Sequence, residues 1–81
     1  MDYSYSKDTR ADLYDNGTRF LAQIETNSGE LVQLTADDAY HAQTLAKCWL
    51  EKFEAKSAAS YRILHGGNLN LIRFFDFRDI D

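Results

Sequence analysis

The chain contains no proline, a single cysteine and no long run of apolar residues. The lone Cys48 excludes an internal disulfide and is typical of a reducing compartment. A membrane span needs roughly 20 predominantly apolar residues, whereas the apolar runs here are two or three residues long. The first residues do not show the charged and then apolar pattern of a secretory leader. These features predict a cytoplasmic protein that does not enter a membrane.

Basic residues are also scarce. The chain has nine Lys and Arg residues but 13 Asp and Glu residues, so its net charge is −4. Phosphate contacts need clustered Lys and Arg side chains. The composition therefore predicts no direct binding to nucleic acid. It favours a basic surface on a protein partner instead.

No catalytic, metal or nucleotide motif is complete. His41 and Cys48 share the polar side of a predicted helix, but two helical turns, about 10 Å, separate them, which is too far for a nucleophile and its base. Neither histidine has the paired spacing of a zinc site, and Gly66-Gly67 lacks the lysine and following helix of a phosphate loop. We expect no enzyme activity, no metal and no cofactor, with Cys48 as an exposed thiol.

Length and composition predict one globular domain, residues 1–81. A hydrophobic content of 44% and a charged content of 27% are normal for a chain that folds. At this size, folding buries only roughly 60% of the surface of the unfolded chain, so stability is marginal. An oligomer or a complex would add stability.

Turn signals divide the chain into five strand-like segments and one helix. Residues 1–10 are expected to form an edge strand or a mobile arm. Asp15-Asn16-Gly17 is typical of a two-residue hairpin and predicts strands over residues 11–14 and 18–26. A third strand is expected over 31–34. Residues 57–60 are expected to form a connector, and Gly66-Gly67 predicts a hairpin that joins strands over 60–65 and 68–77.

The helix is expected from residue 36 to about residue 56. Thr35 is the predicted first cap, and Asp37 and Asp38 complement the positive end of the helix dipole. Apolar residues recur every three or four positions and form one stripe, which consists of Ala39, Ala42, Leu45, Ala46, Trp49, Leu50 and Phe53. The predicted order is β-β-β-α-β-β, an α+β fold in which the helix covers one face of a single antiparallel or mixed sheet.

Large apolar residues occur on both faces of the predicted strands, although one helix covers only one face. The surplus is carried by the adjacent pairs Phe20-Leu21, Leu31-Val32, Ile63-Leu64, Leu71-Ile72 and Phe74-Phe75. It predicts an interaction surface. One alternative is a homodimer with symmetric contacts at Leu21, Val32, Leu64 and Ile72. Another alternative is that the N-terminal arm covers this face. Separately, a bulge in the last strand would exchange the inward and outward residues of that strand.

The C-terminal run of three phenylalanines among charged residues allows two interpretations. The rings pack in the core, or they form an aromatic and acidic contact patch in which carboxylates pair with Lys or Arg of a partner. The residues that we expect to contact a protein partner are Tyr3, Tyr5, Asp37, Asp38, Phe74, Asp76, Phe77 and Asp79.

Part of the chain resembles small phage-encoded anti-CRISPR proteins, in particular a type I-F inhibitor. The resemblance extends from Ser28-Gly29-Glu30-Leu31-Val32, through the alanine-containing helix, to Tyr61-Arg62-Ile63-Leu64-His65-Gly66-Gly67-Asn68-Leu69. It implies a non-enzymatic inhibitor that binds a bacterial defence complex and blocks target-DNA recognition, assembly or nuclease recruitment. We expect such an inhibitor to act by steric occlusion. The alternative is a small homodimeric structural or adaptor protein of phage or bacterial origin.

Overall fold

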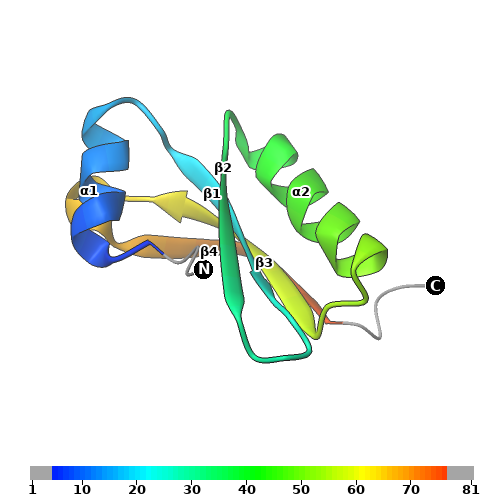
Figure 1. Cartoon of the computed structure of the whole chain (residues 1–81). Helices are drawn as coiled ribbons and strands as arrows, with labels where there is room; N and C mark the ends of the chain where they lie inside the picture. The colour runs from blue at the N-terminus through cyan, green and yellow to red at the C-terminus, as the bar shows by residue number, and fades with distance from the viewer. Residues whose placement is uncertain (1–4, 77–81) are drawn as a thin grey trace.

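The computed structural model describes residues 5–76, so the predicted contacts of Tyr3, Phe77 and Asp79 lie outside the described residues. Two α-helices and a four-stranded antiparallel sheet confirm the α+β class (Figure 1). The elements are α1 (Lys7–Asp15), β1 (Phe20–Glu25), β2 (Leu31–Ala36), α2 (Ala39–Lys52), β3 (Ser57–Ile63), the 3-10 turn η1 (His65–Gly67) and β4 (Leu69–Asp76). The strand order is β2-β1-β3-β4, so β2 and β4 are the two edges.

The helix α1 occupies the place of the first predicted strand, so the β-β-β-α-β-β order is wrong. Ser6 caps the helix, because its Oγ accepts a hydrogen bond from the backbone N–H of Thr9 at 3.2 Å. At the other end Asn16 is the C-cap, and Gly17 follows with a φ of +94°. A glycine in this left-handed conformation commonly ends a helix. Asn16-Gly17 is therefore a helix stop, and the predicted hairpin at this position is wrong.

The second helix, α2, is confirmed as an element but is shorter than predicted. Asp38 is its N-cap, since Asp38 Oδ1 accepts a hydrogen bond from the backbone N–H of His41 at 2.7 Å. The predicted cap, Thr35, belongs to β2. At the C-terminal end, Phe53 is the C-cap and its side chain is exposed. The apolar stripe is thus buried only in part, mainly through Ala42, Ala46 and Leu50.

The predicted connector at residues 57–60 is the first half of β3, a central strand. Its residues Ala58, Ala59 and Ser60 are buried. Small side chains have a low intrinsic preference for strands, but here β1 and β4 pair with both sides of β3. The predicted second hairpin is confirmed in its pairing of β3 with β4, with η1 as its connection.

The main core lies between α2 and one face of the sheet, which we call the α2 face. Ala22 and Ile24 of β1 lie on this face and pack with Ala46 and Leu50 of α2. Phe75 of β4 belongs to the same cluster. Trp49 packs against this cluster while staying partly exposed, as its place on the apolar stripe predicts.

The opposite face of the sheet is covered in part by the N-terminal segment of the chain. Leu21 and Ile63 point to this face, because each neighbours a residue of the α2 face along its strand, and both are fully buried. The backbone N–H of Tyr5 donates a hydrogen bond to Gln33 Oε1 on this face at 3.0 Å. The helix α1 follows and contacts η1 and β3. Part of the apolar surplus that the sequence predicts is therefore buried by the chain itself.

A bulge interrupts the pairing of β3 with β4. Ser60 pairs with Arg73, whereas the next residue, Tyr61, pairs with Leu71. Ile72 is therefore the extra residue in β4. The bulge exchanges inward and outward positions along β4, which is the effect expected of a bulge in this strand.

Candidate interaction surface on β4

Among residues 5–76, the edge strand β4 has the largest group of exposed apolar side chains that lie close together in the sequence. Leu71, Ile72 and Phe74 are 54%, 39% and 55% exposed. We call these three side chains the β4 ridge. Solvent-exposed apolar groups that lie together are typical of interaction sites, and an edge strand also offers unpaired backbone groups.

The bulge brings two members of the β4 ridge to the same face of the sheet. Leu71 is paired with Tyr61, and Phe74 is paired with Ala59. Tyr61 and Ala59 are two residues apart in β3 and so point to the same side, which is the face opposite α2. In a regular strand, the three-residue spacing of Leu71 and Phe74 would place them on different faces.

The two charged residues of β4 lie on different faces of the sheet. The guanidinium of Arg73 lies 5.0 Å from the ring centroid of Phe75 on the α2 face, which is within the range of a cation–π contact. Asp76 is at the end of β4, two residues after Phe74, and therefore on the same face. Asp76 therefore places one charge beside Phe74, and a polar margin around an apolar centre is usual in protein interfaces.

The residues predicted to contact a partner are distributed over separate parts of the fold. Phe74 and Asp76 lie together on β4, whereas Tyr5 lies against the side chain of Gln33 in β2. Asp37 follows the other edge strand, β2. Two strands separate these edges, and neighbouring strands are about 4.8 Å apart, so the edges are roughly 14 Å apart.

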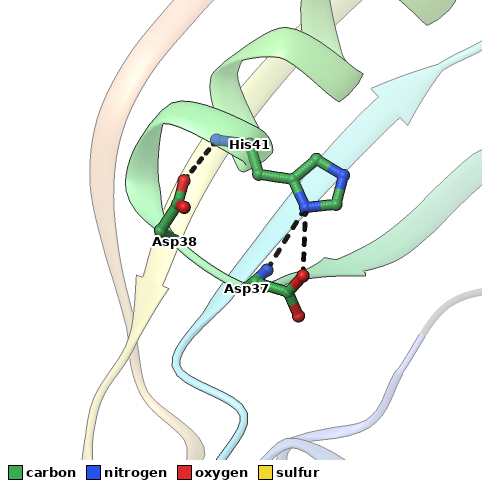
Figure 2. A network of polar contacts seen from close by, with 3 residues as sticks. All are labelled: Asp37, Asp38 and His41. Atoms are coloured by element: carbon green, nitrogen blue, oxygen red, sulfur yellow. Dashed lines mark hydrogen bonds and ion pairs between the residues drawn. The ribbon is translucent and has the colours of Figure 1, made fainter.

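Asp37 and Asp38 belong to a small polar network at the start of α2 (Figure 2). Asp38 caps the helix through the backbone N–H of His41, and Asp37 Oδ2 lies 3.8 Å from His41 Nδ1. The backbone N–H of Asp37 also points to Nδ1, at 3.4 Å. Nδ1 accepts in the contact with the backbone N–H and must carry a proton to donate to Oδ2, so a ring makes one of these contacts at a time. The network stabilises the helix end, which is a local structural role.

Leu71 was not predicted to contact a partner, and Ile72 was predicted only as a homodimer contact, although both belong to the apolar surplus. The available signal was the adjacent apolar pair itself, because neighbouring strand residues point to opposite faces and one helix covers only one of them. Two of the proposed homodimer contacts, Leu21 and Val32, are buried, while Leu64 and Ile72 are exposed.

Other candidate sites have the following geometry. Cys48 is exposed on α2, as predicted. Within residues 5–76, no three His, Cys, Asp or Glu side chains gather in a way that could hold a metal ion. No helix in the same residues has both the length and the apolar character needed to cross a membrane.

Comparison with known proteins finds no matching family model, curated protein or solved structure.

Proposed function

We propose that the protein is a non-enzymatic binding protein that docks on a protein partner through the β4 ridge. The observation that carries this proposal is the exposure of Leu71, Ile72 and Phe74 on an edge strand. A small domain gains stability when such groups are buried, and each side chain of this size contributes about 1.5–3 kcal/mol on full burial. Burial of the β4 ridge against a partner would therefore be favourable.

We further propose that the partner is a bacterial nucleic-acid-targeting defence complex and that the protein, of phage or mobile-element origin, inhibits it in the host cytoplasm. The class of partner comes from the anti-CRISPR resemblance of residues 28–69. The net charge of −4 supports it, because the DNA channel of such a complex must be basic to hold phosphates. Asp76 would pair with Lys or Arg at the rim of the contact, and the bound protein would occlude the channel sterically.

Binding and blocking require no chemistry from the protein itself. His41 and Cys48 are seven residues apart on α2, which corresponds to about 10 Å along the helix axis. His41 faces Asp37 at the start of the helix. This arrangement supports a binding role better than nucleophilic catalysis.

The experiment is size exclusion with light scattering on the protein mixed with purified DNA-targeting effector complexes. Phe74→Ser removes the largest member of the β4 ridge, and an anchor side chain of this kind contributes at least about 2 kcal/mol, or roughly 30-fold in affinity. Tyr40→Ser is the matched control, because Tyr40 is an aromatic residue, 79% exposed, on α2. We expect co-elution of the wild type and of Tyr40→Ser, and its loss for Phe74→Ser.

The salt dependence tests the electrostatic part of the proposal. At physiological ionic strength, salt screens the attraction between exposed charges that lie more than roughly 8 Å apart. Pairing of acidic and basic surfaces therefore weakens as salt rises. Affinity for the effector that does not change between low and physiological salt would refute the acidic mechanism. Equal binding by Phe74→Ser and the wild type would refute the assignment of the β4 ridge.

A further inference from the structure

We propose that Asn16 is a site of spontaneous deamidation and that the C-terminal end of α1 controls how fast it reacts. Asn16 is the C-cap of α1, and Gly17 follows it. The reaction modifies the chain itself, so the proposal does not depend on the proposed function. Its product would loosen α1, which contacts η1 and β3.

The reaction joins the side chain of Asn16 to the backbone of the next residue. The backbone nitrogen of Gly17 loses its proton to a base in solution and attacks Cγ of Asn16. The bond between Cγ and Nδ2 breaks, and Nδ2 takes a proton from water and leaves as ammonia. Water then opens the resulting cyclic imide at either carbonyl, which gives aspartate or isoaspartate. The net reaction consumes water and releases ammonia, and it needs no oxidant or reductant.

Asn16 is the most accessible to this attack of the four asparagines in the chain. Gly17 has no side chain to shield its nitrogen, and a Cβ atom built there meets nothing within 4 Å. Both residues are exposed. Asn27, by contrast, precedes a serine, and its Nδ2 donates a hydrogen bond to the carbonyl oxygen of Glu54. The other two asparagines precede leucine, whose branched side chain hinders the approach.

The folded end of α1 restrains the reaction. The backbone N–H of Gly17 donates a hydrogen bond to the carbonyl oxygen of Tyr14 at 3.0 Å. The next N–H, of Thr18, donates to the carbonyl oxygen of Leu13 at 2.8 Å. With Gly17 at a φ of +94°, these two bonds form a Schellman motif. The attacking nitrogen is therefore occupied, and a ψ of 8° at Asn16 directs it away from the Asn16 side chain.

The attack thus requires a local opening of α1. No residue of this helix is buried, so few apolar contacts oppose the opening. The helix is held at η1, where Arg10 Nε donates a hydrogen bond to the carbonyl oxygen of Gly67 at 2.8 Å. When opening and closing are fast compared with the chemistry, the rate follows the population of the open form. A weaker contact between α1 and η1 should therefore speed up the deamidation of Asn16.

Both products weaken the end of α1. Isoaspartate carries the backbone through its Cβ and Cγ atoms, and the inserted methylene displaces the two N–H groups of the Schellman motif. Aspartate keeps the backbone but adds a negative charge at the end of the helix where the dipole is also negative. Asp12 lies four residues earlier, and like charges at this spacing repel each other. Deamidation would therefore be a slow, one-way weakening of the contact between α1 and η1.

The first experiment ages the full chain at neutral pH and follows each asparagine by mass spectrometry of a protease digest. Replacement of the amide NH₂ by OH raises the mass of the peptide, and isoaspartate elutes separately from aspartate. We expect Asn16 to react before the other asparagines, and more slowly in the folded chain than in the chain unfolded in urea. Faster reaction of Asn27, or equal rates for Asn16 in the two states, would overturn the proposal.

The second experiment weakens the contact at η1 and leaves Asn16 and Gly17 in place. Gly67→Ala should react about tenfold or more faster than its matched control Gly66→Ala, which corresponds to about 1.4 kcal/mol in the opening equilibrium. A Cβ atom at Gly66 has nothing within 4 Å, whereas one at Gly67 meets the backbone of α1. Arg10→Gln removes the hydrogen bond to Gly67 and should also react faster than the wild type. Equal rates in the two alanine variants, or no acceleration by Arg10→Gln, would refute the control by α1.

The third experiment uses Asn16→Asp, which carries the aspartate product in every molecule. Amide exchange in α1 should be roughly two- to fivefold faster than in the wild type, the effect of a single charge at a helix end. Asn27→Asp, in the turn between β1 and β2, is the control and should leave exchange in α1 unchanged. Wild-type exchange in α1 of Asn16→Asp would show that the product does not loosen the helix.

Discussion

The packing of α1 against η1 depends on the absence of a side chain at Gly67. A Cβ atom at this position would lie 2.2 Å from the backbone oxygen of Lys7 and 2.9 Å from the backbone nitrogen of Ala11. Arg10 holds the same contact, because its Nε donates a hydrogen bond to the carbonyl oxygen of Gly67 at 2.8 Å. Gly67→Ala should therefore push α1 away from η1.

The neighbouring glycine provides the matched control. Gly66 and Gly67 have φ values of +84° and +86°, so alanine is strained by about 1–2 kcal/mol at either position. A Cβ atom at Gly66 has nothing within 4 Å. The difference between the two variants thus isolates the close approach of α1.

Gly67→Ala should cost about 2–3 kcal/mol more than Gly66→Ala. The extra cost comes mainly from the loss of the Arg10 hydrogen bond, since bonds to charged groups contribute about 1.5–3 kcal/mol. For 81 residues the total stability is roughly 4–12 kcal/mol, so the effect is a large fraction of it. Urea unfolding followed by far-UV circular dichroism measures the free energies, and amide exchange in α1 reports its detachment. Equal stability of the two variants within about 0.5 kcal/mol would refute the reasoning.

Two further substitutions test local features of the fold. Ser60 Oγ is fully buried and has no hydrogen-bond partner among the described residues. Because an unsatisfied buried hydroxyl costs about 1–3 kcal/mol, Ser60→Ala should raise the urea midpoint of unfolding. A clear fall of the midpoint would show that the hydroxyl is paired. Asp38→Ala removes the N-cap of α2 and should lower the free energy of unfolding by about 0.5–2 kcal/mol. The control Asp37→Ala, one residue earlier, should lower it less. Equal losses of stability in the two variants would contradict the capping role of Asp38.

The sequence was most informative where one physical signal dominated. The apolar stripe of α2 and the pairing around Gly66-Gly67 were both predictable, because helical periodicity and turn glycines are local properties. Strand alternation also predicted that Phe74 and Phe75 lie on opposite faces, since the two residues neighbour each other along the chain.

The errors occurred where one local signal fits two structures. Asn16-Gly17 suits a hairpin turn and a helix end equally well, because both need a residue with positive φ. The helix α1 also has no buried residue that would mark a face, so its periodicity is weak. Ala58 and Ala59 were expected in a connector, because their small side chains have a low intrinsic preference for strands. They belong to a strand because β3 pairs with both β1 and β4.

The candidate site was predictable only in outline. The surplus of apolar residues correctly indicated that some apolar side chains would remain exposed. The identity of the exposed side chains depends on the bulge at Ile72 and on the N-terminal segment. Both are long-range features. Phe74 and Asp76 lie together as neighbours on one strand, whereas Asp37 and Asp38 lie near the other edge because the order of strands places them there.

The most direct test of the central claim is amide hydrogen exchange along both edge strands. The protein is measured at about 5 µM, at about 500 µM, and at about 5 µM with a candidate effector complex. If β4 is the docking strand, amides of β4 should gain protection on self-association or on effector binding, while those of β2, the other edge, should not change. Protection that appears on β2 or α2 instead, or no change anywhere under either condition, would contradict the account.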